Sequence, residues 1–84
     1  MITNKVNINN KSYIDVLNDI YRGKKIRIKD LDHNIDGIYI VRDVFLYRGE
    51  VTFQTEVITD LEKPKGSIEC FEMFPYDKIK ILKN

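Results

Sequence analysis

The side chains with the most suggestive spacing lie in a short polar stretch near the middle of the chain. Four of them carry oxygen ligands: Asp32, Asn34, Asp36 and Asp43. Their spacing, with Gly37 directly after the third, is close to that of a calcium-binding loop, in which alternating carboxylates and amides surround the ion. Such a loop continues into a helix, whereas Ile38–Val41 is rich in β-branched residues that favour a strand. We therefore expect a turn without metal and keep calcium binding as an alternative.

A nucleophile and a general base are each represented once. His33 is the only histidine and Cys70 the only cysteine, so a cysteine- or serine-based enzyme would have to use this histidine. His33 lies in the polar turn, and Cys70 lies in an apolar run, where a cysteine is usually a small packing residue. The carboxylates of Glu69 and Glu72 have opposite parity on an expected strand, so they face opposite ways. We predict that the protein is not an enzyme and has no cofactor.

A cluster of cations in the first third of the chain is a stronger candidate. Lys25, Arg27 and Lys29 alternate with isoleucines, so they share one face of an expected strand. With exposed aromatic side chains beside it, such a face could hold a phosphate backbone and stack bases. Lysines on an exposed strand also prevent pairing between sheet edges. The candidate residues for binding a partner or nucleic acid are Arg22, Lys24, Lys25, Arg27, Lys29, Tyr39, Arg42, Tyr47 and Arg48.

The aromatic residues favour a protein partner. The chain has five tyrosines and four phenylalanines, and the tyrosines cannot all lie inside so small a core. Tyrosine and arginine are enriched in the hot spots of protein–protein interfaces. Tyrosines left outside, together with Arg42 and Arg48, therefore favour a surface that binds another protein.

Length, charge and cysteine content set the limits of these interpretations. With 84 residues the chain can hold one core, so we expect a single domain over 1–84. Its formal net charge is +1, whereas DNA-binding modules are usually far more basic. The polar start shows no secretory signal, and the longest apolar run is far shorter than the roughly 18 residues of a membrane span. A single cysteine allows no intrachain disulfide, and we expect a cytoplasmic protein without membrane contact.

Residues 12–22 have the features of one amphipathic helix. Ser12 can cap the amino end, and Asp15 places a carboxylate in the first turn. Ile14 and Leu17 begin an apolar stripe at helical spacing. Gly23 suits the left-handed residue that follows a helix.

The remaining residues alternate with a period of two. The pattern predicts strands over 5–9, 25–29, 38–47, 50–58, 68–74 and 78–82, with turns over 30–37 and 59–67. Tyr47-Arg48-Gly49 is typical of a hairpin turn, and a bulge at Arg42 and Asp43 would let both charges reach water. We expect a mainly β (α+β) fold, either a small bent sheet or an SH3-like partly open barrel, of five to six strands with one N-terminal helix.

One segment resembles a known family. Residues 13–27, Tyr-Ile-Asp-Val-Leu-Asn-Asp-Ile-Tyr-Arg-Gly-Lys-Lys-Ile-Arg, resemble the opening of small phage proteins of the anti-Thoeris signalling-nucleotide sponge type, in which an amphipathic helix runs into Gly-Lys-Lys and a strand. The family's tryptophan shortly afterwards is missing, because this chain has none. The resemblance, with an Ile-, Lys- and Asn-rich composition similar to that of low-GC Gram-positive bacteria and their phages, implies a small phage or prophage accessory protein.

We therefore predict a non-catalytic binding protein, encoded by a phage, that binds or inhibits a host protein. One alternative is a nucleic-acid-binding SH3-like domain that uses the basic strand. Another is a sponge that sequesters a signalling nucleotide and forms a homo-oligomer, because one short chain encloses little pocket.

Overall fold

The computed structural model describes residues 12–72 and 78–83. They form helix α1 (Tyr13–Tyr21), five strands and one 3-10 turn: β1 (Lys25–Asp30), η1 (Leu31–His33), β2 (Ile35–Tyr47), β3 (Glu50–Thr59), β4 (Ile68–Glu72) and β5 (Ile79–Ile81). The expected strand over 5–9 and the end of the one over 68–74 lie outside the described residues. The predicted mainly β fold with one leading helix is confirmed.

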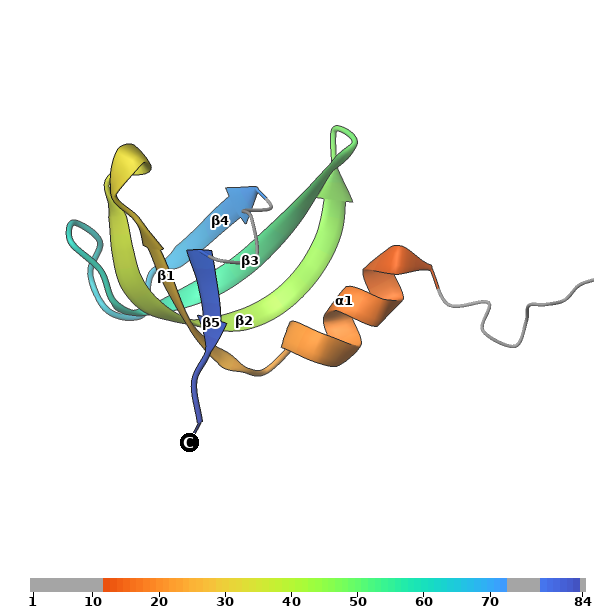
Figure 1. Ribbon diagram of the computed structural model, residues 1–84, viewed down its shortest axis with the longest axis horizontal. Coiled ribbons are helices and arrows are strands. Elements are labelled where there is room, and N and C mark those ends of the chain that lie inside the picture. Colours follow the sequence, from red (N-terminus) through yellow and green to blue (C-terminus); the bar gives the residue numbers. More distant parts are fainter. Residues whose placement is uncertain (1–11, 73–77, 84) are drawn as a thin grey trace, which may run out of the picture.

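The five strands form one antiparallel sheet in the order β4-β3-β2-β1-β5. The sheet curves strongly along β2 (Figure 1). β4 and β5 are its two edges and do not pair with each other, so the sheet stays open. Of the two expected forms, the small bent sheet is the one observed, and the strands do not close into a barrel.

Helix α1 begins and ends where its capping residues predict. The Asp15 amide donates to the Ser12 hydroxyl at 3.1 Å, and the Ser12 amide donates to the Asp15 carboxylate at 3.4 Å. This reciprocal pair forms a capping box even though aspartate replaces the usual glutamate. At the other end, Gly23 has a φ of +81°, which glycine adopts without steric cost. Within the described residues, no helix has the length and apolar character needed to cross a membrane.

The connections differ from expectation at one point and agree at two. The turn after β1 is shorter than predicted: it ends at Asn34, which adopts the left-handed conformation, and β2 already begins at Ile35. The predicted bulge is present, because the pairing of β2 with β3 shifts between Val41 and Asp43. The hairpin between these strands has the two turn residues Arg48 and Gly49, with φ values of +52° and +80°.

One face of the sheet carries the core, and we call it the inner face. Tyr39 of β2 packs edge-on against Phe71 of β4, with ring centres 4.9 Å apart. Tyr21 of α1 packs against Phe53 of β3, with ring centres 5.0 Å apart. The buried apolar side chains are Leu17, Tyr21, Ile26, Ile28, Tyr39, Val41, Val44, Phe53, Val57 and Phe71. The opposite side of the sheet is the outer face.

A side chain of the helix extends the hydrogen bonding of the sheet. β1 pairs with β2 only as far as Ile40, and the Lys24 carbonyl then accepts from the Val41 amide at 3.0 Å. Beyond this point, the Asn18 carboxamide bonds both backbone groups of Val44: it donates to the carbonyl at 2.8 Å and accepts from the amide at 3.0 Å. Asn18 thus replaces a neighbouring strand and holds α1 beside β2 (Figure 1).

Candidate binding surface

The basic strand forms the centre of the candidate surface. Ile26 and Ile28 of β1 are buried on the inner face, so Lys25, Arg27 and Lys29 project from the outer face, as their spacing predicts. β5 adds a cation that the sequence pattern did not single out, because Lys80 lies directly opposite Arg27. Directly opposite residues share a face, so Lys80 belongs to the same outer surface.

Within the described residues, most of these cations have no carboxylate partner. Arg27 donates to Asp36 of β2 at 3.1 Å, and both side chains remain partly exposed. In the part of the chain that the structure describes, Lys25, Lys29 and Lys80 make no ion pair. An exposed ion pair such as Arg27–Asp36 contributes little stability, but it lowers the local positive charge at Arg27. The three lysines therefore carry the free charge of the surface.

Apolar side chains lie beside the cations. Ile40 of β2 is directly opposite Lys25, and Ile38 is directly opposite Arg27; both isoleucines are half-buried. Arg22 and Lys24 are exposed in the link between α1 and β1, immediately before the basic strand. The outer face of β1, β2 and β5 thus combines unpaired lysines with a partly exposed apolar strip. We call this the basic outer face: Lys25, Arg27, Lys29, Ile38, Ile40 and Lys80.

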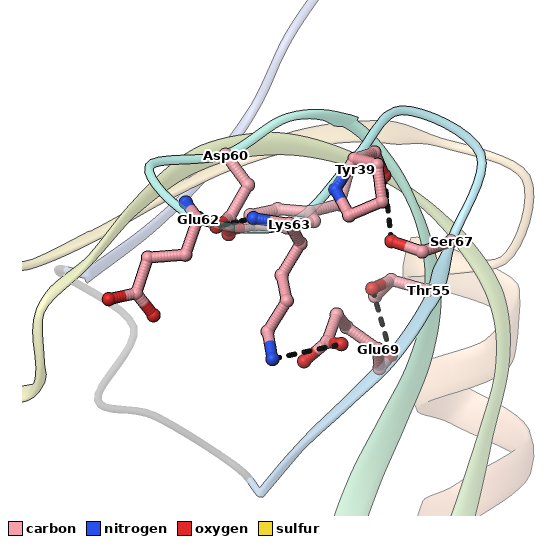
Figure 2. A network of polar contacts seen from close by, with 8 residues as sticks. Tyr39, Thr55, Asp60, Glu62, Lys63, Ser67 and Glu69 are labelled. Atoms are coloured by element: carbon pink, nitrogen blue, oxygen red, sulfur yellow. Dashed lines mark hydrogen bonds and ion pairs between the residues drawn. The ribbon is translucent and has the colours of Figure 1, made fainter.

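Tyr39 was expected beside these cations as an exposed aromatic residue, and this prediction is wrong. Its side chain is fully buried on the inner face. The hydroxyl donates to the carboxylate of Asp60, which follows β3 (Figure 2). Burial, reinforced by this hydrogen bond and the nearby carboxylate charge, raises the pKa of Tyr39 far above its ordinary value. Tyr39 therefore cannot stack on a base at the surface.

Asp60 ties the loop after β3 to the core. Besides the Tyr39 hydroxyl, its carboxylate accepts from the amides of Glu62 at 2.8 Å and Lys63 at 2.9 Å (Figure 2). Partial burial acts to raise the pKa of Asp60, but these three donors outweigh it and lower the pKa below its usual value. The loop is further held where Lys63 approaches Glu69 of β4 at 3.9 Å. This network positions a loop rather than a binding group.

Gly37 makes the approach of Tyr39 to Asp60 feasible. A Cβ atom at Gly37 would collide with the carbonyl oxygen of Thr59 and with the hydroxyl of Tyr39. Only glycine therefore fits at this place in β2, although its backbone φ is not in the left-handed region. The glycine that the calcium-loop spacing would use for a sharp turn serves close packing instead.

The other predicted binding residues lie elsewhere on the sheet. Arg42 is exposed at the bulge and pairs with Glu56 of β3. Tyr47 and Arg48 lie at the β2–β3 hairpin, with the Arg48 guanidinium 5.2 Å from the centre of the Tyr47 ring. Tyr47 lies seven positions after Ile40 on β2, about 23 Å further along the strand. The structure thus does not bring the hairpin pair next to the basic strand.

The oxygen-bearing residues of the polar stretch do not converge on one centre. Asp36 accepts from Arg27, and the side-chain carboxamide of Asn34 donates to the Glu62 carboxylate at 3.3 Å. The Asp43 carboxylate accepts from the backbone amide of Val44 at 3.0 Å. Among the residues that the structure describes, no three His, Cys, Asp or Glu side chains are grouped so that they could hold a metal ion. The alternative calcium loop is not formed, because the chain turns early and β2 carries Asp36 and Asp43 apart.

His33 and Cys70 also occupy different places. The His33 imidazole contacts the buried carboxylate of Asp30 at 2.8 Å, and Lys78 lies 3.9 Å from the same carboxylate. Cys70 is exposed on β4, contrary to the expectation of a buried packing residue. Its neighbours include Tyr47 and Arg48 around a hollow of the outer face. The geometry therefore gives no nucleophile–base pair from these two residues.

Comparison with known protein families, with curated proteins and with solved structures finds no match for this chain.

Proposed function

We propose that this protein is a non-catalytic binding protein that attaches to an acidic surface of another protein through its basic outer face. One observation supports this most directly: Lys25, Lys29 and Lys80 share that face without a carboxylate partner in the described part of the chain. Unpaired surface cations accelerate encounter with an acidic partner and favour it over neutral or basic ones.

The apolar strip beside the lysines favours a protein over a polyanion. Ile38 and Ile40 lie across from Arg27 and Lys25 and are half-buried already, so a partner could cover them with little change in the sheet. A phosphate backbone would gain nothing from these isoleucines. The resemblance of residues 13–27 to phage accessory proteins supports a host protein as the partner, and covering its surface would be sufficient to inhibit it.

Nucleic acid is the second candidate, because the same three lysines could contact phosphates. With Tyr39 buried, such binding would rest on the backbone alone and would be weak and independent of base sequence. Three phosphate contacts to a single strand predict roughly a 20-fold loss of affinity between about 50 and about 200 mM salt. A protein interface that also covers apolar surface should be less sensitive to salt.

A charge-reversal pair tests the proposal. Lys25→Glu/Lys29→Glu alters the basic outer face, and Lys63→Glu/Lys65→Glu alters the loop after β3 by the same net charge. Immobilised wild-type protein and both variants are exposed to a lysate of a low-GC Gram-positive bacterium, with and without nuclease. We expect a nuclease-resistant protein that the wild type and the loop variant retain and the basic-face variant loses.

A labelled single-stranded DNA oligonucleotide, measured by fluorescence anisotropy at low and physiological salt, tests the second candidate with the same variants. If the basic-face variant no longer binds the oligonucleotide and the capture from lysate is sensitive to nuclease, nucleic acid is the ligand of this face. Equal retention of every captured molecule by the two variants would refute a binding role for this face.

A further inference from the structure

The two edges of the open sheet are protected to different degrees. β5 has only three residues and carries Lys80 at its centre, and a short edge strand with lysine resists pairing. β4 has five residues without lysine or proline, and the side chain of its first residue, Ile68, is 54% exposed. Within the described residues, β4 pairs only with β3. β4 is therefore the edge better suited to accept another strand.

The hydrogen bonds of β4 show which backbone groups it offers. The Ser67 carbonyl accepts from the Val57 amide at 2.8 Å, and the Glu69 carbonyl accepts from the Thr55 hydroxyl at 2.9 Å. Both carbonyls therefore face β3. Backbone groups alternate in direction along an antiparallel strand, so the free edge presents the N–H and C=O groups of Ile68, Cys70 and Glu72.

We propose that two copies of this chain associate through β4, with the strands antiparallel about a two-fold axis at Cys70. In this register each Ile68 lies opposite Glu72 of the second copy, and the two Cys70 residues lie opposite each other. All backbone groups at the free edge then find partners. The open sheets of the two copies continue into one sheet.

Charge selects this register over its neighbours. With the axis at Cys70, Glu69 lies opposite Phe71 of the second copy, and no two glutamates are directly opposite. An axis at Glu69 or at Glu72 would place two identical carboxylates face to face, which destabilises a cross-strand pair. The Cys70-centred register is thus the one that pairs all five residues of β4 without like charges in opposition.

A hollow on the outer face complements the exposed isoleucine. It has a volume of about 450 Å³. The residues around it come from the β2–β3 hairpin and from β4: Tyr47, Arg48, Glu50, Thr52, Cys70 and Glu72. Ile68 of the second copy, opposite Glu72 and diagonal to Cys70, reaches the rim of this hollow. By symmetry each isoleucine approaches the hollow of the other copy, as in an isologous interface.

Sedimentation velocity of the full chain under reducing conditions tests the proposal. We expect a concentration-dependent dimer for the wild type and for Cys70→Ser. Cys70→Pro removes the N–H at the two-fold axis but no bond to β3, and proline is tolerated on such an edge. This variant should sediment as a monomer, with its circular dichroism spectrum serving as the control for folding.

Two substitutions at Ile68 test the same register without introducing proline into β4. Both remove the apolar side chain, but Ile68→Glu faces Glu72 of the second copy with a like charge and Ile68→Lys faces it with an opposite charge. We expect roughly a tenfold weaker dimer for Ile68→Glu than for Ile68→Lys. Equal dissociation constants for the two variants would rule out the proposed register.

Disulfide formation on oxidation tests directly whether the two Cys70 residues lie opposite each other in the dimer. In a hydrogen-bonded antiparallel pair the Cα atoms are about 5.5 Å apart, within the roughly 4.4–6.8 Å that a disulfide spans. Mild oxidation should therefore link wild-type chains at Cys70 much faster than it links the control Cys70→Ser/Lys65→Cys, whose exposed cysteine lies in the loop after β3. A wild type that remains monomeric at all concentrations and forms the disulfide no faster than the control would overturn the proposal. The same result would be obtained if β4 accepted a strand from a different protein, so that outcome also counts against self-association.

Discussion

The bond between Asn18 and Val44 allows a quantitative prediction. Val44 is 1% exposed, so its backbone groups are largely shielded from water when Asn18→Ala removes the carboxamide. A buried backbone group left without a partner costs about 1–3 kcal/mol. Asn18→Ala leaves the Val44 carbonyl in this position, while the Val44 amide keeps its bond to the Asp43 carboxylate. The alanine gains about 0.5 kcal/mol in helix propensity, which offsets part of the loss. We expect the free energy of unfolding to fall by about 0.5–2.5 kcal/mol, a sizeable share of the stability of a small domain.

Urea unfolding followed by circular dichroism measures this change, and Asn18→Asp separates the two bonds. The introduced carboxylate can accept from the Val44 amide, but it cannot donate to the carbonyl unless it is protonated. Burial beside that carbonyl should raise its pKa in the folded state, so the stability lost by this variant relative to wild type should be recovered below about pH 4 and lost again as pH rises. A change below about 0.5 kcal/mol for Asn18→Ala would refute the view that Asn18 replaces a strand.

Two further predictions concern the network around Tyr39. Because burial raises the pKa of Tyr39, its contribution to stability is complete below about pH 10 and is lost as pH rises above it. Tyr39→Phe should therefore reduce the loss of melting temperature at alkaline pH. An unchanged dependence of melting temperature on pH would contradict the raised pKa of Tyr39. Gly37→Ala should cost about 2–4 kcal/mol in urea unfolding, because the new methyl group meets the backbone of Thr59. Gly49→Ala, which meets no atom but keeps a φ of +80°, should cost only about 1–2 kcal/mol.

Local structure was predictable from the sequence at the places where one or two residues determine it. Ser12 and Asp15 set the start of α1 through bonds to each other's backbone. The glycine of the β2–β3 hairpin provides the positive φ that the turn requires. The adjacent charges Arg42 and Asp43 required a bulge, since a regular strand would direct one of them into the core.

The candidate site was only partly predictable. Alternation placed Lys25, Arg27 and Lys29 on one face, because the isoleucines between them must be buried. It could not place Lys80 among them, since this depends on which strand pairs with β1 from far along the chain. Nor could it decide that Tyr39 lies inside, because a tyrosine between two isoleucines fits either face of a strand that has apolar residues on both.

The sequence alone thus determined the helix with its caps, the period of the strands and the sign of the charge on β1, because each depends on residues close together in the chain. The tertiary structure alone decided the order of the strands, the burial of Tyr39 beneath Asp60, the pairing of Asn18 with Val44 and the exposure of the β4 edge. These depend on contacts between residues 20 or more positions apart or on the position of a strand within the sheet. Such contacts are selected by the packing of the whole core, and no local pattern of residues specifies them.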